Sequence, residues 1–153
     1  MKRDYAYQID GSACCLYPTE THFGLFELVD GSVIDIFQQF PFSGEWGKTM
    51  VDSLPLREQM PLPRQLDIVY LSITEYRFYY LSLPIKSQEL DKLFNQLRTV
   101  VDPGQIIHLI VGMAPYGGIA LWLGCVSKQL LLGWVISQET HLSMEVFYLR
   151  ILK

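Results

Sequence analysis

Residues 106–124, IIHLIVGMAPYGGIALWLG, constrain the fold of this chain more than any other segment. The stretch is about as long as the roughly 20 residues that a membrane-spanning helix needs. However, Pro115, Gly117 and Gly118 form a turn signal at its centre, and His108 interrupts its first half. Each half has the length of a strand and is rich in Ile, Leu, Val and Trp, so the segment predicts a buried β-hairpin rather than a membrane span. The residues expected in its core are Ile110, Ile119, Leu121 and Trp122.

Alternating apolar and polar residues predict further strands on both sides of this hairpin. Residues 5–9 form a short alternating run, and residues 23–29 and 32–40 flank Asp30-Gly31, a strong hairpin signal. Residues 66–73 and 76–81 alternate around a turn expected at Thr74-Glu75. Two later strands are expected at residues 129–136 and 143–151. Most of the chain is therefore expected to form β-sheet.

One amphipathic helix is predicted at residues 87–101. Ser87 is its expected N-cap, and Glu89 and Asp91 lie in the first turn, where the helix dipole favours acidic side chains. Asp102-Pro103-Gly104 should end the helix. The apolar stripe expected to pack on a sheet is Leu90, Leu93, Phe94, Leu97 and Val101. The sequence thus predicts an α+β fold, mostly β, in which an antiparallel sheet or sandwich packs against one helix.

Length and composition indicate a single domain that spans residues 1–153. Half of the residues are hydrophobic and 18% are charged, which excludes a disordered chain. The net charge of -4 and the scattered Lys and Arg residues disfavour nucleic-acid binding. Residues 41–64 are expected to form a long loop within the domain, with a short helical turn between residues 51 and 60. The prolines in this loop are Pro41, Pro55, Pro61 and Pro63.

The sequence contains no familiar motif of catalysis, nucleotide binding or metal binding, such as GxSxG, a Walker A loop, HExxH or CxxC. The histidines, His22, His108 and His141, have no ligand spacing. His108 lies in an apolar strand, which favours a hydrogen-bonded structural histidine, and His22 is expected in an exposed turn. We therefore expect no catalytic residue, no metal site and no cofactor. An enzyme whose site is assembled only in three dimensions is an alternative.

Gly11-Ser12-Ala13-Cys14 resembles a bacterial lipoprotein cleavage site, but residues 1–10 contain no apolar segment ahead of it. The sequence as given therefore predicts a cytoplasmic protein. If a signal peptide has been removed, the expectation becomes a periplasmic protein or an outer-membrane lipoprotein. Cys14, Cys15 and Cys125 are expected to be buried free thiols.

Aromatic and charged residues in the predicted turns are the candidate partner-binding residues. Trp46 has glycines nearby, so its ring either stays accessible as an anchor or folds back over the core. Tyr116, at the tip of the 106–124 hairpin, has the same two interpretations. Glu75 and Arg77 bracket a turn, where they would either form a surface ion pair of little energetic value or grip a partner.

The order of these segments resembles an uncharacterised bacterial family, known only as a domain of unknown function, many of whose members are envelope lipoproteins. The resemblance rests on Pro61-Leu62-Pro63, on LDIVYLSITEYRFYYLSLP at residues 66–84, on the helix at residues 90–97 and on VGMAPYGGIALWLG at residues 111–124. The family pattern has Trp where Tyr70 stands and Gly where Tyr116 stands.

Relatives in that family are similar to small proteins encoded beside secreted antibacterial toxins, including toxins of type VI secretion. The resemblance therefore implies an immunity protein, which binds and blocks a cognate toxin and needs no reactive group of its own. Acidic side chains would then face a basic toxin cleft and steer association. The acidic residues considered for this role are Glu20, Asp30, Glu45 and Asp52. The alternative is an envelope module that binds a small apolar ligand between its sheets.

Overall fold

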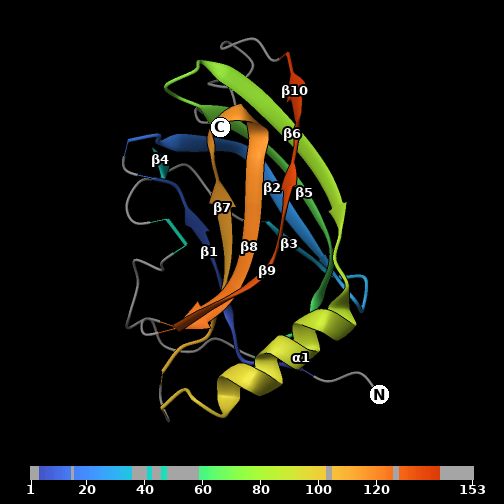
Figure 1. Ribbon diagram of the computed structural model, residues 1–153. Helices are drawn as coiled ribbons and strands as arrows, with labels where there is room; N and C mark the ends of the chain where they lie inside the picture. The colour runs from blue at the N-terminus through green and yellow to red at the C-terminus, as the bar shows by residue number, and fades with distance from the viewer. Residues whose placement is uncertain are drawn as a thin grey trace.

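The computed structural model describes residues 4–14, 16–35, 41–42, 46–47, 59–102, 105–125 and 128–141. Its strands form two sheets that face each other (Figure 1). The first sheet has the order β1-β7-β8-β9, and the second has the order β10-β6-β5-β2-β3, with β4 also paired to β2. The strand bounds are β1 Gln8–Ser12, β2 Thr19–Leu28, β3 Val33–Asp35, β4 Pro41–Phe42, β5 Pro63–Ser72, β6 Arg77–Pro84, β7 His108–Met113, β8 Gly118–Cys125, β9 Lys128–Ile136 and β10 Gln138–Thr140. The predicted α+β, mostly β fold is confirmed.

The three predicted hairpins are all present. Gly31 adopts φ 88° in the turn between β2 and β3, which explains the Asp-Gly signal. The turn at residues 73–76 joins β5 to β6, and a 3-10 turn, η1 Pro115–Gly117, joins β7 to β8. The expected continuation of β3 through residue 40 and the strand at residues 143–151 lie outside the described residues. Of the helical turn expected between residues 51 and 60, only residues 59 and 60 are described, and Met60 forms a β-bridge with Tyr5.

The N-terminal strand departs from the antiparallel expectation, because β1 pairs parallel to β7, with Gln8 opposite His108 and Ser12 opposite Gly112. It also lies further along the chain than the expected run at residues 5–9. Its partner is about a hundred residues away, so no turn residue in the sequence marks the pairing. Ser137 separates β9 from β10, and the chain passes there from one sheet to the other.

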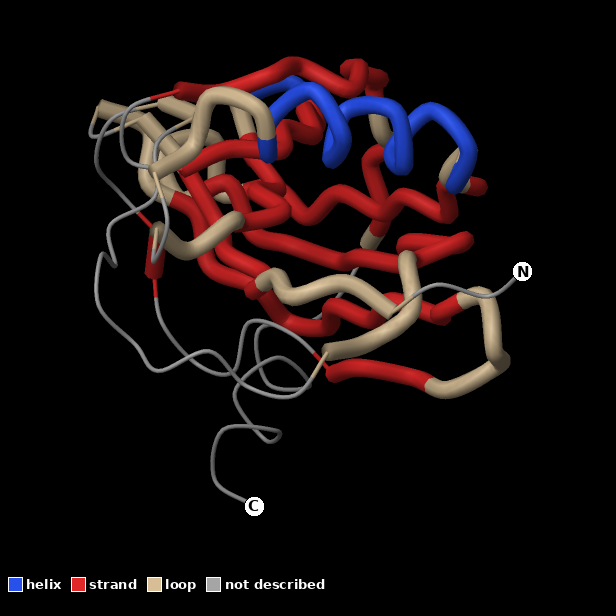
Figure 2. Tube along the Cα trace, turned by 90° about the horizontal axis from the view of Figure 1, so that it is seen from below, coloured by secondary structure: helices blue, strands red, loops and turns tan. Residues whose placement is uncertain are grey.

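The one α-helix in the described part, α1 Ser87–Arg98, lies across one end of the sandwich (Figure 2). It buries Leu90, Phe94 and Leu97, as its apolar stripe predicts. The centroid of the Phe94 ring lies 4.9 Å from that of Tyr5 and 5.5 Å from that of Tyr7. The N-terminal segment therefore packs against the buried face of the helix. The helix ends earlier than residue 101, because Thr99 already caps it through its backbone N–H.

Three expectations about single residues are wrong. Lys86, not Ser87, occupies the N-cap position, and the Ser87 hydroxyl donates to the carbonyl of Pro63 at 3.0 Å instead. Trp122 is only half-buried, because it lies on the outer face of its sheet, whereas Ile110, Ile119 and Leu121 are buried as expected. His22 lies within β2 rather than in an exposed turn.

Candidate functional site

Two hairpin turns at one end of the sandwich each present an exposed tyrosine in the left-handed backbone region. Tyr76, in the β5–β6 turn, has φ 57° and is 67% exposed. Tyr116, in η1, has φ 59° and is 78% exposed. Within the described ranges they are the only non-glycine residues with positive φ. The left-handed region costs a residue other than glycine roughly 1–2 kcal/mol, so both turns are strained.

Glu75 ties the two turns together. Its Oε2 accepts a hydrogen bond from the backbone N–H of Tyr116 at 3.0 Å, and its Oε1 accepts one from the Tyr79 hydroxyl at 2.9 Å. Burial alone would raise the pKa of Glu75, but hydrogen bonds, including these two, outweigh burial and lower it. The pKa of Tyr79 is raised to about 12, mainly by burial and next by the hydrogen bond that its hydroxyl donates to Glu75. An ionised carboxylate therefore holds the turn of Tyr116 against the turn of Tyr76.

Further apolar side chains surround the two turns. The backbone N–H of Ile73 donates to the carbonyl of Pro18 at 3.1 Å, which brings the segment before β2 beside the β5–β6 turn. Figure 1 shows the hairpin turns at the end of the sandwich away from α1. We call this end the tyrosine end, and its exposed residues are Leu16, Tyr17, Ile73, Tyr76 and Tyr116.

All three tryptophans of the chain line one open groove on the outer face of the four-stranded sheet. Its volume is about 590 Å³, within the range of roughly 300–1,000 Å³ seen for ligand pockets. Small residues of β8 lie beside large residues of β9: Gly118 opposite Ile136, and Ala120 opposite Trp134. Trp134 is 71% exposed. We call this site the tryptophan groove: Trp46, Trp122, Trp134, Gly118, Ala120, Leu131 and Ile136.

Trp46 stays accessible, and it packs against the outer face of the four-stranded sheet rather than over the core. Its ring packs edge-on against that of Trp122, with centroids 4.9 Å apart and an interplanar angle of 86°, yet 42% of the residue is exposed. Gly112 makes the stack possible, because a Cβ there would come within 2.8 Å of Trp46 and 2.4 Å of Trp122. The backbone N–H of Gly47 donates to the Ser12 hydroxyl at 3.0 Å, which anchors the segment to β1.

The groove and the tyrosine end are continuous, because Ala114 and Gly118, on either side of η1, both line the groove. Trp46 thus lines the groove, and Tyr116 lies in the turn whose two flanking residues border it. Tyr76 and Trp134 were missed. The alternation of Trp134 and Ile136 along β9 would have placed both on one face, but nothing local in the sequence indicates that this face is uncovered.

The charged residues predicted to bind a partner do not gather at one place on the surface. Arg77 pairs with Glu139 at 3.7 Å on the surface, while Glu75 turns toward Tyr116. Glu20 is half-buried in β2, where burial raises its pKa. Asp30 is exposed and accepts hydrogen bonds from the Ser32 N–H and hydroxyl in the turn beyond the other end of β2. Glu45 and Asp52 lie outside the described residues.

The histidines do not converge. His108 Nδ1 lies 3.6 Å from Asp10 Oδ2, but His108 is only 1% exposed and does not line the groove. His22 belongs to the other sheet, and His141 follows β10 on the surface. In the described part of the chain, no three His, Cys, Asp or Glu residues are grouped so that they could hold a metal ion. No helix there has the length and apolar character needed to cross a membrane.

Residues 19–150 match the model of a family described as protein of unknown function (DUF2931), and the chain therefore belongs to this family. The match includes α1 and every described strand except β1. Comparisons with curated proteins and with solved structures gave no match.

Proposed function

We propose that this member of the family is a non-catalytic binding protein that neutralises a cognate secreted bacterial toxin by direct contact. The observation that carries the proposal is the pair of strained, exposed tyrosines on turns joined by Glu75, continuous with the tryptophan groove. Strained backbone persists only where the surrounding structure enforces it, and it is often associated with function.

The chemistry of this surface favours a protein partner. Tyrosine and tryptophan supply large contact areas with few rotatable bonds, and they dominate the binding energy of many protein interfaces. A contiguous apolar surface of this kind is unusual on a protein without a partner. The edge-on packing of Trp46 against Trp122 restricts these two rings before binding, which reduces the conformational entropy that they lose on binding.

Charge gives weaker support to the toxin proposal. Net charge -4 favours encounter with a basic partner. However, Glu20 and Asp30 lie toward opposite ends of the ten-residue strand β2, which spans roughly 30 Å. They do not form one acidic patch, so the aromatic side chains rather than these carboxylates are proposed to provide the affinity.

The test is titration calorimetry between the purified protein and the product of the gene adjacent to its own, combined with a growth-protection assay. We expect a tight complex that protects cells. Tyr116→Gly, Tyr76→Gly and Trp134→Ala should each weaken it by about tenfold or more, as loss of an interface anchor does. Val100→Ala, which shortens an exposed apolar side chain just beyond α1, is the control and should bind normally.

Absence of both a complex and protection would refute the toxin proposal. A complex that forms equally well with all three groove and turn variants would refute the assignment of the surface.

A further inference from the structure

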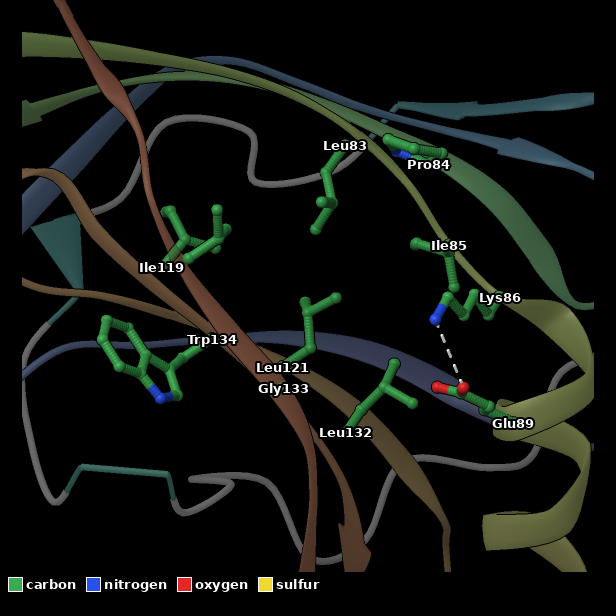
Figure 3. A pocket seen from close by; sticks show the side chains of 11 residues that line it. Leu83, Pro84, Ile85, Lys86, Glu89, Ile119, Leu121, Leu132, Gly133 and Trp134 are labelled. Carbon is green, nitrogen blue, oxygen red and sulfur yellow. Dashed lines mark ion pairs between the residues drawn. The ribbon is translucent and has the colours of Figure 1, made fainter.

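A second apolar site lies between the two sheets, on the face of β9 opposite the tryptophan groove. Its cavity of about 160 Å³ opens beside the start of α1 (Figure 3). Leu83 and Ile85 line it from β6 and the segment after it, and Ile119, Leu121 and Leu132 line it from β8 and β9. An enclosed apolar cavity of similar volume, about 150 Å³, binds benzene in another protein. The present cavity differs in that it is open on the side of Lys86 and Glu89. The space therefore suits a hydrocarbon group of about six carbons.

Gly133 keeps this cavity open. It lies opposite Leu121, which points into the core, so a side chain at position 133 would point the same way. A Cβ built on Gly133 meets no atom within 4 Å. A glycine inside a strand lowers stability, and it often marks a β-bulge or a site that a ligand approaches closely. Gly133 adjoins the register shift between β8 and β9 and also faces open space.

The charged residues of this site, Lys86 and Glu89, lie at the mouth of the cavity. Lys86 and Glu89 line it and pair at 3.5 Å, but both side chains are well exposed. Exposed pairs of this kind contribute little, so the Lys86 ammonium can exchange Glu89 for another anion at low cost. Lys86 also occupies the N-cap of α1, where the helix dipole adds to its positive charge.

From these features we infer that the cavity binds a small carboxylic acid as its anion. The hydrocarbon part lies between the sheets against Leu83, Ile119 and Leu121, and the carboxylate pairs with Lys86 at the mouth. Ile119 and Trp134 line both this cavity and the tryptophan groove, but Lys86 and Leu83 line only the cavity. Variants at Lys86 therefore test the carboxylate site without altering the proposed toxin-binding surface.

The experiment is an NMR titration of the whole chain, methyl-labelled at Ile, Leu and Val, with hexanoate, 1-hexanol and hexylamine. Hexanoate should shift the methyl signals of Ile119, Leu121 and Leu83 saturably, with a Kd on the order of 1 mM or tighter. Hexanol should bind about threefold or more weakly, because it cannot pair with Lys86. Hexylamine should bind weakest of all, because the N-terminal end of the α1 dipole disfavours a cation there even though Glu89 is nearby. No saturable shift, or equal binding of all three probes, would overturn the inference.

Two variants test the geometry. Gly133→Leu should fill the cavity, raise Tm and abolish the hexanoate shifts, and Gly133→Val serves if the larger side chain prevents folding. Lys86→Gln should retain hexanol binding and lose the preference for hexanoate. Val100→Ala should bind hexanoate as the unaltered protein does. Undiminished hexanoate binding by a folded Gly133 variant would place the ligand elsewhere and refute the site.

Discussion

Tyr116 combines an exposed side chain with a backbone that glycine would adopt more readily. We expect Tyr116→Gly to leave the free energy of unfolding unchanged or to raise it by up to about 1 kcal/mol, because relief of strain offsets the greater chain entropy of glycine. Chemical denaturation followed by circular dichroism measures this. Tyr116→Ala retains the strain and should be less stable than Tyr116→Gly. A clear loss of stability in the glycine variant would show that the ring stabilises the fold instead.

Glu75 provides a prediction about pH. Its pKa is lower in the folded than in the unfolded protein, so its ionised form contributes stability above about pH 4.3. That contribution is lost as the pH falls through the lower, folded pKa, when the carboxyl group accepts a proton. A carboxyl-carbon NMR titration should give a Glu75 pKa below 4.3, and the amide signal of Tyr116 should move with it. A normal or raised pKa would contradict the link between the two turns.

At the scale of an element, α1 stabilises the sandwich mainly through its buried face. Phe94 is fully buried and contacts the rings of Tyr5 and Tyr7. We expect Phe94→Ala to cost about 3–5 kcal/mol, as aromatic truncation in a core does. Lys92→Ala, on the exposed face of the same helix, should change stability by less than about 0.5 kcal/mol. If the two variants lost equal stability in a denaturation experiment, the buried face of the helix would not be what stabilises the sandwich.

Elements whose causes are local in sequence are predicted well, and those that depend on distant partners are not. Asp30-Gly31 and the Pro115–Gly117 turn determine their hairpins through backbone geometry, so both are foreseen from a few residues. The parallel pairing of β1 with β7 has no local signal. Trp122 was misplaced for a similar reason, because both halves of its hairpin are almost wholly apolar and alternation cannot tell the inner face from the outer one.

The same limit applies to the candidate site. Trp46 and Tyr116 are recognisable as accessible aromatics because turn residues surround them. Trp134 and Tyr76 become significant only when the sheets bring them beside those residues. The cavity next to Gly133 depends on three separate strands and a helix terminus, so no stretch of sequence contains it.

At the scale of the whole molecule, the topology predicts slow folding. The parallel β1–β7 pairing joins residues about a hundred positions apart, and β9 and β10 link the two sheets late in the chain. Proteins dominated by such non-local strand pairs fold in roughly milliseconds to seconds. Stopped-flow circular dichroism after dilution from denaturant should show a main phase in this range. A microsecond phase that recovered the full signal would contradict it.

The gathering of every tryptophan of the chain in one groove has an optical consequence. The ultraviolet emission of an indole ring depends on the polarity around it. In this protein the whole tryptophan emission originates from residues that line one groove. A partner that covers the exposed ring of Trp134 should shift the emission to shorter wavelengths. Local rearrangement at β2 or β3, which line neither the groove nor the cavity, should leave this emission nearly constant. The protein thus carries, without any label, a spectroscopic reporter of its own candidate binding surface.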